Sequence, residues 1–301
     1  MSQVAISAPA HPPILDDEYA RRFGGVARLY GPQALERFSA AHVCVIGIGG
    51  VGSWVAEAVA RCGVGKFTLI DLDHIAVSNT NRQIHALGDA YGMAKVDAMA
   101  ERILQINPRA EISRIDDFVT VENVEALLGH PFDYVIDAID AVKVKTAIIA
   151  FCKRTGKRVV TCGAAGGQLD PTRIRVTDLS RTIQDPLLAK VRGNLRRQHG
   201  FPKNPKSRFG IDAVFSDEPL RYPEPEQQAC DVELPVESSH AGIDDLAAAG
   251  DIAVVNAPPA PQPAQQGPQG LACAGFGSSV CVTAVFGMVA ASTALRAIAG
   301  V

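Results

Sequence analysis

A glycine-rich loop near residue 50 has the spacing of a nucleotide-binding motif. It reads GIGGVG, between an apolar strand and a predicted helix, and its glycines are Gly47, Gly49, Gly50 and Gly52. Glycines let the backbone turn tightly and approach a phosphate, and the N-terminus of the helix offers N–H groups and partial positive charge. Asp71 ends the next strand about 20 residues later, where an acidic side chain accepts hydrogen bonds from ribose hydroxyls. The loop and the acid predict a bound nucleotide but leave ATP and NAD both open.

More polar residues follow this strand than an NAD-binding protein needs. They are Asp73, Asn79, Asn81, Arg82, Gln83 and Lys95. Cationic side chains such as Arg82 and Lys95 stabilise negative charge on phosphate groups. Asp140 ends a later strand, in YVIDAID, where a carboxylate suits a Mg²⁺ ion that bridges phosphates; a cap of the following helix is the alternative. Asp137, one turn earlier, is expected to hold the loop.

The pattern D-x-D-x-x-x-x-S-N-x-N-R-Q, followed by G-x-x-K, resembles the ubiquitin-activating superfamily with its bacterial MoeB- and ThiF-type members. The resemblance implies that the nucleotide is ATP and that Mg²⁺ accompanies it. Nucleotide binding is implied for the four glycines and for Asp71, Asp73, Asn79, Arg82 and Lys95. The resemblance further implies that Asp140 binds the metal and that Arg82, Lys95 and Asp140 are the catalytic residues.

Six segments resemble one branch of this superfamily, the tRNA threonylcarbamoyladenosine dehydratases. They are RRFGGVARLYG, NTNRQIHALGDAYGMAK, QINP, YVIDAID, GGQLDPTRIRVTDLSRTIQDPL and GFGS, and only residues 231–270 lie outside the resemblance. Members of this branch are implied to be homodimers that use ATP to close the threonylcarbamoyl group of an adenosine next to the anticodon into a ring. The resemblance also implies partnership with a cysteine desulfurase and its sulfur acceptor.

The sequence departs from MoeB-type enzymes at two places. Its seven cysteines form no C-x-x-C pair, so we expect no zinc site. MoeB-type enzymes also carry R-x-x-R near the N-terminus, whose second arginine enters the partner subunit's ATP site. Here Gly25 stands three residues after Arg22, so Arg22 and Arg28 both remain candidates for that charge. Cys230 matches a region where family members often carry cysteine, which leaves a thioester role and an inert loop thiol both open.

Two other functions compete with a tRNA-modifying dehydratase. The first is an adenylyltransferase that activates the C-terminus of a ubiquitin-like sulfur-carrier protein, and the missing zinc cysteines argue against it. The second is an NAD-dependent oxidoreductase or a nucleotide-binding module without activity, and Arg82, Lys95 and Asp140 argue against that. We therefore predict an ATP-dependent enzyme that adenylates a carboxylate in tRNA, after which the neighbouring carbamoyl group closes a ring.

The elements that must position these residues alternate through the first half of the chain. The expected strands are His42–Ile46, Lys66–Asp71, Glu111–Ile115, Tyr134–Ala138, Arg158–Cys162 and Arg173–Thr177. The expected helices are Ser53–Arg61, Met93–Gln105, Val121–Leu128 and Lys143–Arg154. Such alternation predicts an α/β fold, a Rossmann-like doubly wound and mostly parallel sheet with a C-terminal α/β extension. Ligands bind at the carboxyl ends of such strands, where Asp71, Asp140 and Gly163 lie.

The second half of the chain has a different character. Residues 181–208 hold eight Lys or Arg against one Asp, in a chain whose net charge is −3. This run predicts a surface for tRNA phosphates, with a solvated helix face as the alternative. Its expected contacts are Lys190, Arg192, Arg196, Arg197, Lys203, Lys206 and Arg208.

Composition divides the chain into five parts. We expect an N-terminal segment at 1–30, an ATP-binding domain at 31–180, a basic tRNA-binding region at 181–230, a disordered insertion at 231–270 and an apolar C-terminal helix on the core at 271–301. The insertion has six acids, six Pro and eight Ala but no Lys or Arg, so it cannot bury a core. Residues 271–295 carry no charge and are long enough to span a membrane, but their many small residues favour a buried helix. The N-terminus lacks a basic start and an apolar core, so we expect no signal peptide and a cytoplasmic location.

Overall fold

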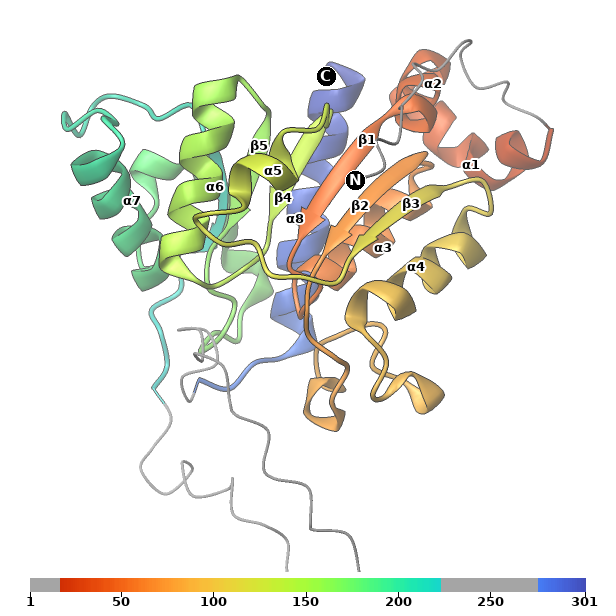
Figure 1. The fold of residues 1–301 in the computed structure, drawn as a ribbon, viewed down its shortest axis with the longest axis horizontal. Coiled ribbons are helices and arrows are strands. Elements are labelled where there is room, and N and C mark those ends of the chain that lie inside the picture. Colours follow the sequence, from red (N-terminus) through yellow and green to blue (C-terminus); the bar gives the residue numbers. More distant parts are fainter. Residues whose placement is uncertain (1–16, 223–275) are drawn as a thin grey trace, which may run out of the picture.

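A seven-stranded sheet forms the centre of the molecule (Figure 1). The computed structural model describes residues 17–222 and 276–301; the predicted insertion, Cys230 and Cys273 lie outside them. The strands are β1 (His42–Ile46), β2 (Lys66–Ile70), β3 (Glu111–Ile115), β4 (Tyr134–Asp137), β5 (Val159–Cys162), β6 (Ile174–Asp178) and β7 (Asp212–Ser216). Their order is β3-β2-β1-β4-β5-β7-β6, and all neighbours run parallel except β6 and β7. The predicted Rossmann-like, mostly parallel α/β fold is confirmed.

The strand order reverses between β1 and β4. From β1 the chain adds β2 and β3 on one side, and β4 and β5 on the other. Ile46 at the end of β1 pairs with Ile70 of β2 and with Asp137 of β4. Three loops therefore leave the sheet next to one another at this edge. Such a reversal opens the crevice in which doubly wound sheets bind ligands.

Helices cover both faces of the sheet (Figure 1). One hydrophobic core is shared by the sheet with α1 (Asp17–Tyr30), α2 (Pro32–Ala40), α3 (Gly52–Arg61), α4 (Lys95–Ile106) and α8 (Val280–Ala299). The other core is shared with α5 (Val124–Leu128), α6 (Val142–Thr155) and α7 (Pro186–Gln198). Strand residues alternate between the two cores because successive side chains point to opposite faces. In β1, Val43 and Val45 face the first core, whereas Cys44 and Ile46 face the second.

The C-terminal helix α8 is long and apolar enough to cross a membrane by length and composition alone. In the structure it lies against α3, α2 and strands β4 and β5 (Figure 1). Phe286, Ala290 and Ala294 are fully buried there. Gly287 allows a close approach to α3, because a Cβ at this position would lie 2.7 Å from the Val51 carbonyl oxygen. The helix α8 therefore packs against the element that follows the glycine loop.

Local hydrogen bonds explain two differences between the predicted and observed element ends. The helix predicted from Val121 begins at Val124, because the side chains of Thr120 and Asn123 each accept a hydrogen bond from the other's backbone N–H. The strand predicted from Arg173 begins one residue later, because a short 3-10 helix capped by Asp170 precedes it. The helices α1, α2 and α7 and the strand β7 were not predicted from the sequence.

Candidate nucleotide-binding site

The glycine loop turns tightly between β1 and α3. Gly47 has a φ of +85°, and a Cβ there would lie 2.9 Å from Ile139 Cγ2 in the loop after β4. A Cβ on Gly52 would lie 1.7 Å from the Gly47 carbonyl oxygen, so neither position has room for a side chain. A Cβ on Gly49 would meet nothing within 4 Å. The loop thus leaves the Gly49 side open, next to a helix N-terminus that has no side-chain cap.

The carboxylate of Asp71 is fixed directly beneath this loop. Its Oδ2 accepts a hydrogen bond from the Ile48 N–H at 2.5 Å, and its Oδ1 accepts one from the Asp73 N–H at 2.9 Å. Its side chain is 9% exposed. Burial raises the pKa of Asp71, while the Lys95 ammonium and the two N–H groups oppose that shift. The carboxylate is therefore held in one orientation beside the loop, where it can accept hydrogen bonds from a ribose.

Lys95 brings a cation to the same edge. Its Nζ lies 2.7 Å from Asp73 Oδ2 and 4.0 Å from Asp71 Oδ1, and its side chain is 7% exposed. Lys95 is the first residue of α4, where the helix dipole disfavours a positive charge, and the two carboxylates compensate. The Asp73 side chain is 57% exposed, so an anionic phosphate in the crevice can compete with it for the ammonium group.

Arg82 covers the glycine loop from the other side. A Cβ on Gly50 would lie 3.1 Å from Arg82 Cγ, so the aliphatic part of the arginine packs directly on the loop. Its Nη1 donates to the Ser78 carbonyl at 2.8 Å, and Trp54 Nε1 on α3 donates to the Arg82 carbonyl at 3.0 Å. The first bond orients the guanidinium, and the second fixes the Arg82 backbone against α3.

The two asparagines of the motif serve the backbone around Arg82. Asn79 is buried, and its Oδ1 accepts a hydrogen bond from the Ala76 N–H at 3.0 Å, which closes the turn. The Nδ2 of Asn81 donates to the Ser278 carbonyl at 2.9 Å, and the Val280 N–H donates to the Asn81 carbonyl at 3.1 Å. Asn81 therefore joins the motif to the start of α8. Nucleotide binding by Asn79 remains a prediction, and in the structure its side-chain Oδ1 is used by the turn.

Asp137 and Asp140 occupy different environments in the loop after β4. Asp137 is fully buried; its Oδ2 lies 2.8 Å from Lys145 Nζ and accepts a hydrogen bond from the Thr161 hydroxyl at 2.8 Å. Its Oδ1 accepts from the Ile139 N–H at 3.3 Å. Asp137 and Lys145 thus fix the loop from below. Asp140 is half-buried and lies just before α6, at the edge where β1 and β4 end.

The chemistry of this loop fits a Mg²⁺ ion that is bound mainly by phosphate. Within residues 17–222 and 276–301, no three His, Cys, Asp or Glu side chains come close enough to hold a metal by themselves. Mg²⁺ typically uses one or two carboxylates together with substrate phosphates and water. Asp140 is the carboxylate that can fill this role.

His85 is a buried residue of this region that was not predicted from the sequence. It is 4% exposed, and neither ring nitrogen has a hydrogen-bond partner among the described residues. Burial lowers its pKa to about 4, and the positive charges of Lys95 and Arg102 add to the shift. His85 is therefore neutral at physiological pH. Its position two residues after Gln83, inside a motif of polar residues, gave no sign of this burial.

Most of the described thiols are not available as nucleophiles. Burial raises the pKa of Cys152 and of Cys162 to about 12, and it also raises the pKa of Cys44 and Cys62. These four thiols are protonated at neutral pH, and the thiolate is the reactive form. The predicted alternatives for Cys230 concern a residue outside the described part of the chain.

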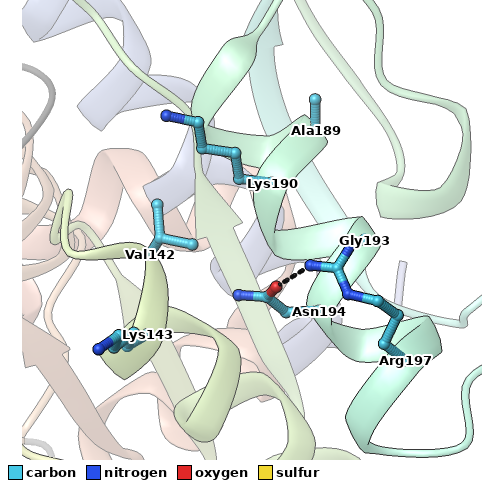
Figure 2. A pocket seen from close by; sticks show the side chains of 7 residues that line it. All are labelled: Val142, Lys143, Ala189, Lys190, Gly193, Asn194 and Arg197. Atoms are coloured by element: carbon cyan, nitrogen blue, oxygen red, sulfur yellow. Dashed lines mark hydrogen bonds between the residues drawn. The ribbon is translucent and has the colours of Figure 1, made fainter.

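The predicted tRNA contacts of the basic run fall into three groups: residues with contacts inside the protein, residues that line a surface groove, and exposed residues after α7. The Arg192 guanidinium donates to the Thr182 hydroxyl, and burial lowers its pKa. Arg196 lies over the Phe209 ring, 5.2 Å from its centroid. Lys190 and Arg197, by contrast, line a surface groove (Figure 2). The remaining three, which are exposed in the segment after α7, are Lys203, Lys206 and Arg208.

The two arginines near the N-terminus also differ. Arg22 on α1 lies 2.8 Å from Glu18 Oε1 and donates to the Ile106 carbonyl at 3.4 Å. Arg28, in the last turn of the same helix, is exposed. The ion pair of Arg22 makes Arg28 the less engaged of the two candidates for a contact with a partner subunit.

Fold and site together define the class of protein. The chain belongs to the ThiF family, whose model matches residues 19–301. It is 49% identical to the tRNA threonylcarbamoyladenosine dehydratase of Escherichia coli strain K12 over 284 residues. This aligned region covers 94% of this chain and 95% of the E. coli protein. It is 56% identical over 208 residues to the enzyme of the same name from Haemophilus influenzae, which covers 69% and 80% of the two chains. The resemblance inferred from the sequence motifs is thus confirmed.

Solved structures agree with this assignment. The crystal structure of the E. coli dehydratase, TcdA, in complex with ATP matches this chain with a TM-score of 0.76 and 46% identity, over 95% of this chain and 96% of that one. The same enzyme in complex with AMP matches with a TM-score of 0.76 and 46% identity over 95% and 97%. The likeness therefore includes both the fold and almost the whole length of the chain.

Proposed function

We propose that this chain is an ATP-dependent dehydratase that acts on threonylcarbamoyladenosine next to the anticodon of tRNA. It activates the carboxylate of this nucleoside and closes the threonylcarbamoyl group into a ring. The observation that carries this proposal is the set of Asp71, Arg82 and Lys95 around the open side of the glycine loop. Two relatives that are named for this activity support the same function. The alignment with one of them covers 94% of this chain.

The reaction follows from the chemistry of the substrate. A carboxylate is a poor electrophile, so one of its oxygens first attacks the α-phosphorus of ATP and pyrophosphate leaves. The carbamoyl group of the same nucleoside then attacks the activated carbonyl carbon, and AMP leaves with that oxygen. The substrate thereby loses the elements of water. Because both groups belong to one molecule, proximity lowers much of the barrier, and the protein mainly positions them.

The residues of the site divide this task. The glycine loop and the N-terminus of α3 bind phosphate oxygens, and Asp71 accepts hydrogen bonds from the ribose. Arg82 and Lys95 stabilise the negative charge that builds up as pyrophosphate leaves. To do so, Lys95 exchanges the exposed carboxylate of Asp73 for a phosphate oxygen. Asp140 would hold Mg²⁺, and the ion would neutralise phosphate charge.

Further parts of the proposal concern partners and location. The function implies tRNA as the macromolecular substrate. A homodimer in which Arg28 or Arg22 approaches the partner subunit's ATP site fits the family resemblance, as does cooperation with a cysteine desulfurase and its sulfur acceptor. We place the reaction in the cytoplasm, where tRNA is found.

Mass spectrometry of nucleosides tests the proposal. The protein is incubated with ATP, Mg²⁺ and tRNA that carries threonylcarbamoyladenosine, and the tRNA is then digested. We expect a nucleoside lighter by the mass of one water, formed with ATP and absent when NAD replaces ATP. An unchanged nucleoside, together with adenylation of the C-terminal Gly-Gly of a small sulfur-carrier protein, would overturn the proposal.

A further inference from the structure

A basic groove lies between the start of α6 and the outer face of α7 (Figure 2). Its volume is about 610 Å³, and its polar lining consists of Lys143, Lys190, Asn194 and Arg197. Lys190 and Arg197 belong to the basic run, whereas Lys143 comes from a helix more than forty residues earlier in the sequence. The tertiary structure therefore adds one cation that the charge count of residues 181–208 does not include.

Helical spacing explains why α7 contributes this lining. Lys190, Gly193, Asn194 and Arg197 follow the i, i+3, i+4, i+7 pattern of one helix face. The opposite face is buried in the core and consists of Leu187, Leu188, Val191 and Leu195. Gly193 has no side chain, and the Arg197 guanidinium lies over it, because a Cβ at this position would be 3.4 Å from Arg197 Nη1. The groove is thus formed by the polar stripe of an ordinary amphipathic helix.

The groove presents positive charge and hydrogen-bond donors. None of its lining residues is acidic. The helix α6 begins beside it, and its cap residue Ala141 provides no side-chain acceptor for the first N–H groups. Such an end carries partial positive charge, which makes Lys143 unfavourable there unless an anion is bound. Asn194 Oδ1 accepts a hydrogen bond from Arg197 at 2.6 Å. The NH₂ group of the Asn194 amide therefore lies on the side of Lys143 (Figure 2).

The groove is adjacent to the candidate reaction centre. Lys143 stands three residues after Asp140, and three residues of extended chain span at most roughly 11 Å. A polyanion that places one of its nucleotides beside the bound ATP can therefore reach the groove with a neighbouring nucleotide. This position favours RNA over an acidic protein segment.

We propose that this groove binds the backbone phosphates of the nucleotides that flank the reacting adenosine in the tRNA anticodon loop. The proposal rests on the proposed function and makes it more specific. Lys143, Lys190 and Arg197 contact phosphates, and the Asn194 amide donates to a phosphate or ribose oxygen. The contacts fix the position of the RNA without reading its bases. Arg192 and Arg196 do not line the groove, and their guanidinium groups contact Thr182 and Phe209 instead.

A pair of matched triple variants tests the groove. The groove variant is Lys143→Ala, Lys190→Ala and Arg197→Ala. The control variant is Arg21→Ala, Lys66→Ala and Lys153→Ala, which removes one arginine and two lysines that lie outside the basic run, on α1, at the start of β2 and on α6. Affinity for tRNA that carries threonylcarbamoyladenosine is measured at several salt concentrations. ATP-induced thermal shift shows whether each variant is folded and binds nucleotide.

The salt dependence of single-strand binding sets the expected effect. Each phosphate contact contributes a slope of about 0.7 in log affinity against log salt, so three contacts contribute about 2.1. At 0.1 M salt the groove variant should therefore bind tRNA about 100-fold more weakly than the wild type, with a flatter salt dependence. The control variant should stay within about twofold, and both should keep the ATP-induced shift.

The outcomes separate this proposal from the proposed function. If the wild type converts the nucleoside but both variants lose tRNA affinity equally, or neither does, the groove is not the RNA site. If the groove variant keeps full tRNA affinity but loses affinity for an acidic protein, the proposal is also wrong and the groove binds that protein. A wild type that neither binds nor converts the tRNA would overturn the proposed function itself.

Discussion

Replacing His85 with phenylalanine should remove a pH-dependent part of the protein's stability. The imidazole is 4% exposed, without a hydrogen-bond partner for either nitrogen among the described residues, and close enough to Lys95 and Arg102 to feel both charges. Its pKa is lowered to about 4 in the folded protein, against about 6.5 for an exposed histidine. Phenylalanine keeps a planar ring at this position and cannot bind a proton.

The sign and size of the effect follow from proton linkage. Because the folded pKa is below the unfolded one, the unfolded chain binds more protons between pH 4 and pH 6.5. Stability is therefore full above pH 6.5 and is lost as the pH falls through this window. From the two pKa values, protonation of His85 in the unfolded chain lowers the wild type's free energy of unfolding by about 1.3 kcal/mol between pH 7.5 and pH 5.5. The variant avoids this cost, and at pH 7.5 it also avoids burying imidazole nitrogens without partners, which typically costs about 1–3 kcal/mol.

Urea unfolding at pH 5.5 and pH 7.5 measures this difference. The free energy of unfolding should decrease in both proteins when the pH is lowered from 7.5 to 5.5. We expect the decrease to be about 1.3 kcal/mol smaller in His85→Phe than in the wild type. Taking the difference between the two proteins cancels the contributions of other titrating groups. An equal fall in both proteins would refute the reasoning, because it would mean that the folded pKa of His85 is not depressed.

Two further pairs of variants probe the site itself. Gly49→Ala should leave the melting temperature unchanged but weaken ATP binding, because its Cβ would enter the open side of the loop. Gly52→Ala should destabilise the fold, because its Cβ would lie 1.7 Å from the Gly47 carbonyl oxygen. Thermal unfolding with and without ATP distinguishes them, and equal melting temperatures would contradict the geometry. Lys95→Ala and Asp140→Ala should each slow ATP consumption by about 10²–10³-fold while circular dichroism stays unchanged. Pyrophosphate release at the wild-type rate would show that their proposed roles are wrong.

The sequence by itself determined the class of fold, the position of the nucleotide loop and the family. These features are encoded locally. A G-x-G-x-x-G between an apolar strand and a helix requires only neighbouring residues, and Gly47 indeed has the positive φ that glycine adopts easily. The alternation of strands and helices located β1 to β6 to within one residue at each end. The polar motif at 71–95 was close enough in sequence to be read as one unit.

Only the tertiary structure decided which distant residues meet. The insertion of β7 between β5 and β6 depends on pairing across the sheet, and α1 is hidden in the sequence by Gly24 and Gly25, which are poor helix formers. Likewise, a charge count cannot tell that Arg192 is engaged by Thr182 while Lys143 joins Lys190 and Arg197 at one groove. Local sequence sets backbone preferences and periodicity, whereas burial, ion pairing and pKa arise from contacts between segments far apart in the chain.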